Sequence, residues 1–271
     1  MDMATIPAPA TLPDPTPGPA APPAEVYLFA TCLLDLFAPQ AGLDAIEVIE
    51  RLGVRVSFPI GQTCCGQPAY TSGFPDDARA VAAAQLDLFP EPWPIVVPSG
   101  SCGGMIRHHW PRLFADDPLR SAKAAAIAAR TVEFTDFVAG LLGDRPAPAG
   151  AAETLCLHTS CSARREMGTH RVGRDLLARL PGVTLAVHDH EPECCGFGGT
   201  FSVKQPDISA AMAADKVEAI LATGCDRFVS ADCGCLMNLN LTLEKRGASV
   251  RGEHIASFLL RRLGSGEEPA R

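Results

Sequence analysis

The same arrangement of cysteines occurs twice in this chain, and the repetition constrains its fold more than any other feature. The first set is Cys32, Cys64, Cys65 and Cys102, and the second is Cys161, Cys194, Cys195 and Cys235. Equivalent cysteines are separated by 129, 130, 130 and 133 residues. Scattered core cysteines would not keep one register in this way. We therefore infer a tandem duplication of a domain of roughly 120 residues.

Short apolar runs precede the repeated cysteines, and each run predicts a buried strand. In the first half we expect strands at 26–30, 54–60, 94–98 and 131–134, with helices at 43–52, 76–89 and in the segment that ends at 142. In the second half we expect strands at 154–158, 183–187 and 227–230, with helices at 170–180 and 206–222. This alternation predicts an α/β fold of two tandem pseudo-symmetric units, each with a small parallel sheet of three or four strands flanked by helices.

Composition separates the ends of the chain from its globular part. Residues 1–24 contain eight prolines and no basic residue, which predicts a disordered Pro/Ala-rich extension. We expect the first cysteine-rich domain at 25–144 and the second at 152–264, with a linker rich in proline and glycine between them.

The charge pattern excludes several classes of partner. The net charge of −8 argues against nucleic acid, and prolines and Asp35 interrupt every apolar run that is long enough for a transmembrane segment. The first basic residue is Arg51, so we expect neither a secretory signal nor a transit peptide, and a cytoplasmic location.

The predicted topology gathers the repeated cysteines at one edge of each sheet. The carboxyl ends of parallel strands share an edge, and ligands bind there. Helix N-termini at this edge lower thiol pKa values. Glycines that follow the cysteines, among them Gly66, Gly103 and Gly196, let the backbone approach a bulky group closely. The sequence therefore predicts a site that binds a cofactor through thiolates.

Three kinds of chemistry suit such a site, and an iron–sulfur cluster is favoured. A disulfide within a vicinal pair is unfavourable, because neighbouring Cα atoms lie about 3.8 Å apart, below the usual range of about 4.4 to 6.8 Å. A cluster offers separate iron atoms to adjacent thiolates. A zinc site and a redox-active thiol site stay open as alternatives. Cys156 and Cys225 fall outside the repeat and fit small buried hydrophobic residues.

The motifs also resemble a known family. The segments C…CCG…SGSC and C…CCG…DCGC, which begin at Cys32 and Cys161, are similar to the cysteine-rich CCG domain. That domain occurs twice in the cysteine-rich component of heterodisulfide reductase, in the iron–sulfur component of glycolate oxidase and in the lactate utilization proteins. The resemblance spans about residues 25–263. No C-x-x-C-x-x-C-x-x-x-C run of a ferredoxin-like part is present, so the chain is most similar to the lactate utilization group.

The resemblance implies a non-flavin oxidoreductase subunit that transfers electrons in a complex oxidising L-lactate to pyruvate. It also implies a ferredoxin-type iron–sulfur subunit and a third small subunit as partners. Related complexes oxidising glycolate or glycerol 3-phosphate, or resembling heterodisulfide reductase, are the alternative. The eight repeated cysteines would hold one [4Fe-4S] cluster in each half.

The sequence departs from the family pattern at one position in each half. Ser99 and Asp232 stand where heterodisulfide reductase has a fifth cysteine, with Cys233 as a possible substitute in the second half. The choice between a cubane and a noncubane cluster is therefore open.

The remaining polar residues carry weaker signals. His158 and His188 precede second-half cysteines, where a hydrogen bond to a cluster is conceivable, but ordinary strand-edge histidines are the simpler interpretation. Arg164 and Arg165 fit a solvated helix face. No flavin or nicotinamide fingerprint is present, and the sequence indicates no catalytic residue.

Overall fold

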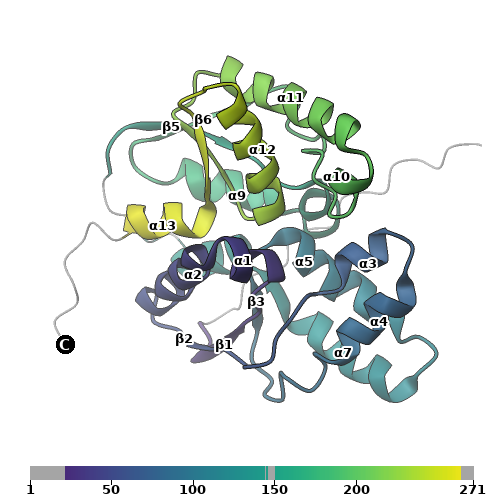
Figure 1. Ribbon diagram of the computed structural model, residues 1–271. Coiled ribbons are helices and arrows are strands. Elements are labelled where there is room, and N and C mark those ends of the chain that lie inside the picture. The colour runs from purple at the N-terminus through teal and green to yellow at the C-terminus, as the bar shows by residue number, and fades with distance from the viewer. Residues whose placement is uncertain (1–21, 144, 146–149, 264–271) are drawn as a thin grey trace, which may run out of the picture.

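Two parallel sheets of four strands form the framework of the protein (Figure 1). The computed structural model describes residues 22–143, 145 and 150–263. The strand order is β2-β1-β3-β4 in the first sheet and β6-β5-β7-β8 in the second. The two units therefore share one topology, and the predicted fold class is confirmed. The domain boundaries stay a prediction, and most of the expected N-terminal extension lies outside the described residues.

The first unit runs from β1 to α8. Its elements are β1 (Glu25–Leu28), α1 (Cys32–Phe37), α2 (Pro39–Arg51), β2 (Arg55–Ser57), α3 (Gln67–Thr71), α4 (Pro75–Ala83), β3 (Ile95–Val97), α5 (Gly100–Gly104), the π-helical turn η1 (Met105–His109), α6 (Trp110–Leu113), α7 (Pro118–Arg130), β4 (Thr131–Glu133) and α8 (Phe134–Leu142). The strand at 54–60 and the helix at 76–89 are both shorter than predicted.

The second unit repeats this plan. Its elements are β5 (Glu153–Leu157), the π-helical turn η2 (Ala163–Met167), α9 (Thr169–Ala178), β6 (Val183–Ala186), α10 (Phe201–Lys204), α11 (Pro206–Ala222), β7 (Arg227–Ser230), α12 (Cys233–Lys245), β8 (Arg251–His254) and α13 (Ile255–Leu263). The predicted bounds of α11 and β7 are confirmed. Strand β8 was not expected, because its polar sequence RGEH has no apolar run; it pairs with β7 at the edge of the sheet.

Alternation along the strands divides the apolar side chains among three layers. Val26 and Leu28 point to a central core, whereas Tyr27 and Phe29 point to an outer core of the first unit. In β5, Leu155 again belongs to the central core. The central core thus contains residues of both units, and each sheet is covered on both faces.

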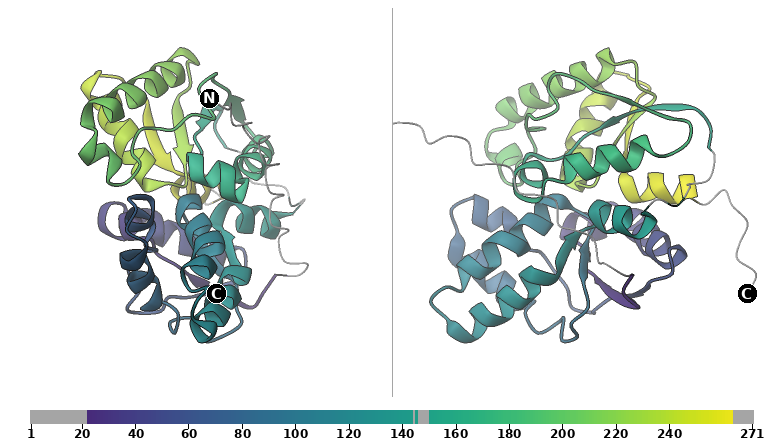
Figure 2. Two further views of the ribbon diagram at one scale, coloured as in Figure 1. Left: turned by 90° about the vertical axis from the view of Figure 1, so that its right-hand side faces the viewer. Right: turned by 180° about the vertical axis from the view of Figure 1, so that it is seen from behind.

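The two units pack through reciprocal helix contacts. Helix α2 of the first unit packs against α13, and α9 of the second unit packs against α8 (Figures 1 and 2). Likewise α5 contacts η2, and α12 contacts α1. These pairs exchange under a pseudo-twofold axis, so the two units face each other with equivalent surfaces. Within the described residues no helix has both the length and the apolar character needed to cross a membrane.

Candidate metal centre

A cavity of about 600 Å³ lies where the carboxyl ends of the two sheets face each other. All eight repeated cysteines line it, and so do residues from α1, α3, α5 and α12. Each cysteine comes from a loop or helix start that follows a strand, as the topology predicts. The two sets therefore share one cavity between the units, a relationship that the sequence did not reveal.

The first set brings together three distant segments. Cys32 Sγ lies 3.5 Å from Cys64 Sγ, and Cys65 Sγ lies 3.3 Å from Cys102 Sγ. Cys32 is the first residue of α1, and Cys102 lies in the first turn of α5. Both cysteines therefore lie at helix N-termini, where the helix dipole favours negative charge.

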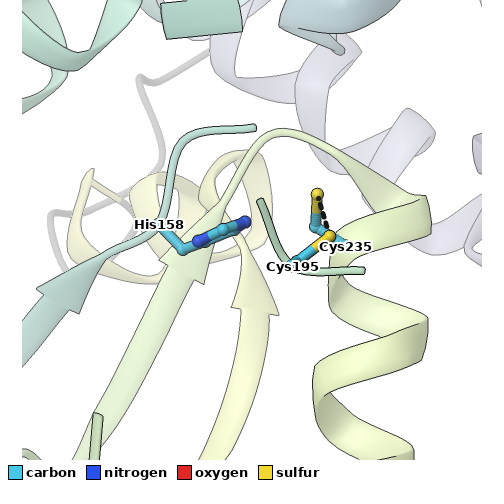
Figure 3. Close-up of side chains that lie close together, drawn as sticks. All are labelled: His158, Cys195 and Cys235. Carbon is cyan, nitrogen blue, oxygen red and sulfur yellow. Dashed lines mark hydrogen bonds between the residues drawn. The ribbon is translucent and has the colours of Figure 1, made fainter. Parts of the chain in front are cut away.

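The second set repeats this geometry. Cys195 Sγ lies 3.1 Å from Cys235 Sγ, which belongs to the first turn of α12 (Figure 3). Cys161 and Cys194 interact through their sulfurs, as Cys194 and Cys195 do. Four thiols from three segments therefore converge in this half as well.

The glycine of each CCG motif shapes the turn beneath the sulfurs. Gly66 and Gly196 have φ angles of +87° and +84°, in the left-handed region that favours glycine. Each glycine amide donates to the first cysteine of its vicinal pair. Gly66 N donates to Cys64 Sγ and Gly196 N to Cys194 Sγ, both at 3.4 Å. A Cβ at Gly196 would lie 2.5 Å from Ser209 O, so helix α11 leaves no room for a side chain.

These contacts favour a thiolate at the first cysteine of each pair. Hydrogen bonds from Cys32, Cys65 and the Gly66 amide lower the pKa of Cys64 to about 3. The equivalent donors lower the pKa of Cys194 to about 2. Each set thus has an anionic sulfur ready to bind a metal.

Two donors that the sequence did not identify, buried Trp110 and half-buried Asn238, hold the second cysteine of each pair. The Trp110 indole donates to Cys65 O at 2.9 Å, and the Asn238 amide donates to Cys195 O at 2.8 Å. Asn238 lies on α12, which also contains Cys235, and Trp110 begins α6, which follows α5 and η1. A donor side chain in the helical segment after the last cysteine of each set is the signal that would have found them.

Ser99 and Asp232, which replace the fifth cysteine, contact each other across the two units. Ser99 Oγ donates to Asp232 Oδ1 at 2.9 Å, and Ser101 N donates to the same oxygen at 3.1 Å. Cys233 packs in an apolar cluster with Ala30, Leu34 and Ala41, and burial raises its pKa to about 12. Burial therefore favours the thiol form of Cys233, which also lines the cavity beside the repeated cysteines.

The structure places His158 beside the second set of sulfurs, whereas the sequence alone favoured an ordinary strand-edge histidine. A ring nitrogen of His158 and the sulfurs of Cys195 and Cys235 all lie within 4.8 Å of one another (Figure 3). The ring is 0% exposed, neither nitrogen has a hydrogen-bond partner, and burial lowers its pKa to about 3. His188 is also buried with both nitrogens unpartnered.

The other candidate residues occupy varied positions. Gly103 lies inside α5 and is not among the described residues that line the cavity. Cys156 and Cys225 are buried and interact with each other, outside the two sets. Arg164 pairs with buried Glu191 at 2.6 Å, whereas exposed Arg165 lines the cavity.

The donor set fits an iron–sulfur cluster. Each half offers four sulfurs, including an adjacent pair, and one sulfur has a strongly lowered pKa. Adjacent thiolates suit separate iron atoms of one cluster better than a single ion. The cavity of about 600 Å³ is also far larger than one ion needs.

Comparison with known proteins agrees with these features. The family model described as a cysteine-rich domain, CCG, matches residues 26–107 and 155–240. Lactate utilization protein A from Bacillus velezensis is 43% identical over 235 residues, covering 87% of this chain and 98% of that protein. The Bacillus subtilis protein of that name is 42% identical with the same coverage. A hypothetical protein from Helicobacter pylori shares the fold, with a TM-score of 0.63 and 11% identity, over 93% of this chain and 51% of that one.

Proposed function

This chain belongs to the cysteine-rich CCG domain family, and we propose from that premise that it is an iron–sulfur electron-transfer subunit of an L-lactate-oxidising system. The observation that carries the proposal is the convergence of eight cysteines on one cavity. The similarity to proteins named lactate utilization protein A supports the choice of substrate.

We assign one [4Fe-4S] cluster to each half, with four thiolate ligands for each. The first cluster would be held by Cys32, Cys64, Cys65 and Cys102, and the second by Cys161, Cys194, Cys195 and Cys235. Ser99 and Asp232 already bind each other, which supports four ligands in each half rather than five.

The chain's own residues prepare these positions. A bound cluster would supply reversible one-electron transfer. The amides of Gly66 and Gly196 stabilise negative charge on sulfur through their hydrogen bonds. Trp110 fixes the backbone at Cys65 and, being fully buried, keeps water away from that side of the site.

Hydride removal from lactate belongs to another component in this proposal. The sequence has no flavin or nicotinamide fingerprint. We therefore place the chain beside a ferredoxin-type iron–sulfur subunit and a third small subunit, in a complex that converts L-lactate to pyruvate. Reduction of the iron–sulfur centres by L-lactate, but not by glycolate or glycerol 3-phosphate, in the assembled complex tests the substrate.

Anaerobic purification tests cluster binding directly. We expect a brown protein that contains equal amounts of iron and acid-labile sulfide, measured by absorbance and chemical assay. Cys194→Ser should lose about half of the iron, because it removes one site of two. Cys156→Ser is the matched control, because Cys156 lies outside both sets, and it should keep full iron. Unchanged iron in Cys194→Ser would refute the ligand assignment.

A zinc site is the second candidate, and one observation favours it. His158, Cys195 and Cys235 offer three ligand atoms within 4.8 Å of one another, a spacing that suits a single ion. Colourless protein with stoichiometric zinc and no sulfide would select this alternative.

A further inference from the structure

The two cysteine sets are equivalent in position but differ in the residues that lie behind them. Phe29 N donates to Val96 O in the first unit, and His158 N donates to Val229 O in the second. Each of the two residues precedes the first cysteine of its set by three positions. A buried aromatic hydrocarbon in one unit is therefore replaced by a buried imidazole in the other.

A second pair of equivalent positions differs in charge. The Gln85 side chain accepts from Thr63 N and donates to Thr63 Oγ1, which holds the loop before Cys64. In the second unit, Lys216 Nζ donates to His190 O and Glu191 O, which holds the loop before Cys194. A neutral amide in the first unit thus corresponds to an ammonium group in the second.

The Lys216 ammonium is buried and acts on the second set of sulfurs. Its residue is 1% exposed, and its charge interacts with Cys194, Cys195 and Cys235. Burial lowers the pKa of Lys216, while these sulfurs oppose that shift by favouring the charged form. In the first unit, the strongest influences on the thiols of Cys64 and Cys65 are other cysteines, neighbouring amides and burial.

One carboxylate near the second set opposes Lys216. Asp232 acts on Cys235 with the opposite sign. Its Oδ1 accepts hydrogen bonds from Ser99 and Ser101 of the first unit, which partly compensate its negative charge. Exposed Glu193 is paired with His190 at 2.7 Å. Buried Lys216 thus adds a positive charge to the second site, whereas none of the strongest influences on Cys64 and Cys65 is a cation.

We propose that Lys216 and His158 give the second cysteine set a higher reduction potential than the first, so that an added electron resides in the second unit. The inference rests on the proposed iron–sulfur function. An electron adds negative charge, which a nearby buried cation stabilises strongly in a medium of low polarity. The unpartnered imidazole within 4.8 Å of two sulfurs supplies a hydrogen-bond donor, and such donors also raise cluster potentials. Lys216 and His158 thus act on the second cluster through charge and hydrogen bonding, and neither is assigned as a cluster ligand.

Potentiometric titration followed by electron paramagnetic resonance tests this difference in the full chain. The Cys64→Ser variant keeps only the second site, and the Cys194→Ser variant keeps only the first site. We expect a higher midpoint potential in Cys64→Ser than in Cys194→Ser. Equal midpoints, or the reverse order, would overturn the inference while leaving the iron–sulfur function intact. Protein without iron and sulfide would remove both proposals, and the metal assay reports that outcome separately.

Substitutions at the asymmetric positions test which residues cause the difference. Lys216→Gln copies Gln85 and should lower the second-site midpoint, so that the equilibrium for electron transfer into that site falls about tenfold, or about 59 mV for one electron. Lys216→Arg should restore the potential, and Lys245→Gln is the control, because Lys245 is exposed. A merely structural Lys216 would lower the melting temperature of Lys216→Gln without moving the midpoint, and would overturn its assigned role. If Lys216→Gln does not fold, His158→Phe, which copies Phe29, tests the other residue of the proposal and should also lower the second-site midpoint.

Discussion

Ser99 Oγ lies 2.9 Å from Asp232 Oδ1, although 133 positions separate the two residues in the chain. They are equivalent residues of the two units, so their hydrogen bond joins the halves at the pseudo-twofold axis. Both are buried beside the cavity that the cysteines line. These two equivalent positions therefore serve to connect the two units.

This hydrogen bond should contribute measurably to stability. Ser99→Ala removes a donor from a buried carboxylate and removes the N-cap of α5, so we expect a loss of about 1 to 3 kcal/mol in the free energy of unfolding. Urea unfolding of Ser99→Ala, Asp232→Asn and the double variant checks this. A coupling energy of about 1 kcal/mol is expected. If the losses in the free energy of unfolding from the two single substitutions simply add in the double variant, the hydrogen bond between Ser99 and Asp232 does not contribute to stability.

Gly196→Ala should disrupt the second site more than an ordinary glycine substitution does. The left-handed backbone alone costs about 1 to 2 kcal/mol, and the new Cβ would press on Ser209 O. Gly224→Ala is the matched control, because Gly224 also has a positive φ of +68° but open space around its Cβ position. Thermal unfolding and iron content should both fall further in Gly196→Ala, with about half of the iron lost. Equal effects in the two variants would contradict the steric argument.

Asp136 should make the protein less stable as the pH rises. Burial raises the pKa of Asp136 to about 7, from an ordinary value near 3.8, and neither carboxylate oxygen has a hydrogen-bond partner. Because the folded-state pKa is the higher one, its stabilising contribution is complete below about pH 4 and is lost progressively up to about pH 7. Asp136→Asn should therefore be more stable than the wild type at pH 8, by up to roughly 4 kcal/mol, with a smaller difference at pH 5.

Urea unfolding at the two pH values measures this effect. Burial and the Asp136 carboxylate both raise the pKa of neighbouring Glu133, so the pH dependence reports the two carboxyl groups together. Exposed Asp77→Asn serves as the control and should show no such dependence. A stability difference independent of pH would mean that Asp136 does not titrate in this range.

Removal of iron should weaken the protein without unfolding it. The central core and most of the outer cores consist of aliphatic and aromatic residues that need no metal. Chelation under mildly oxidising conditions should therefore leave the far-ultraviolet circular dichroism nearly unchanged and lower the melting temperature, because a ligand that binds only the folded state stabilises it. Loss of helical signal on iron removal would show instead that the clusters organise the fold.

The sequence predicted the features that depend on local pattern and known topology. The convergence of Cys64 and Cys65 with Cys102 follows from strand ends that share an edge, and the start of α11 agrees with Pro206, because proline favours the first turn of a helix. Strand β8 was missed, because a short polar edge strand carries no apolar signal.

Contacts between the two units were beyond sequence reasoning. The approach of Ser99 to Asp232 depends on how the units pack, which no spacing encodes. The ring of His158 was equally hard to place, because a strand-edge histidine has the same local sequence whether it faces solvent or sulfur.

The reciprocal packing of α2 on α13 and of α9 on α8 also bears on ancestry. A single unit would expose to water the apolar face that now forms half of the central core. A single unit paired with a second copy of itself would bury this face in the same way. Two identical chains must carry the same residue at equivalent positions. Two units joined in one chain can carry different residues there, as Phe29 and His158 do.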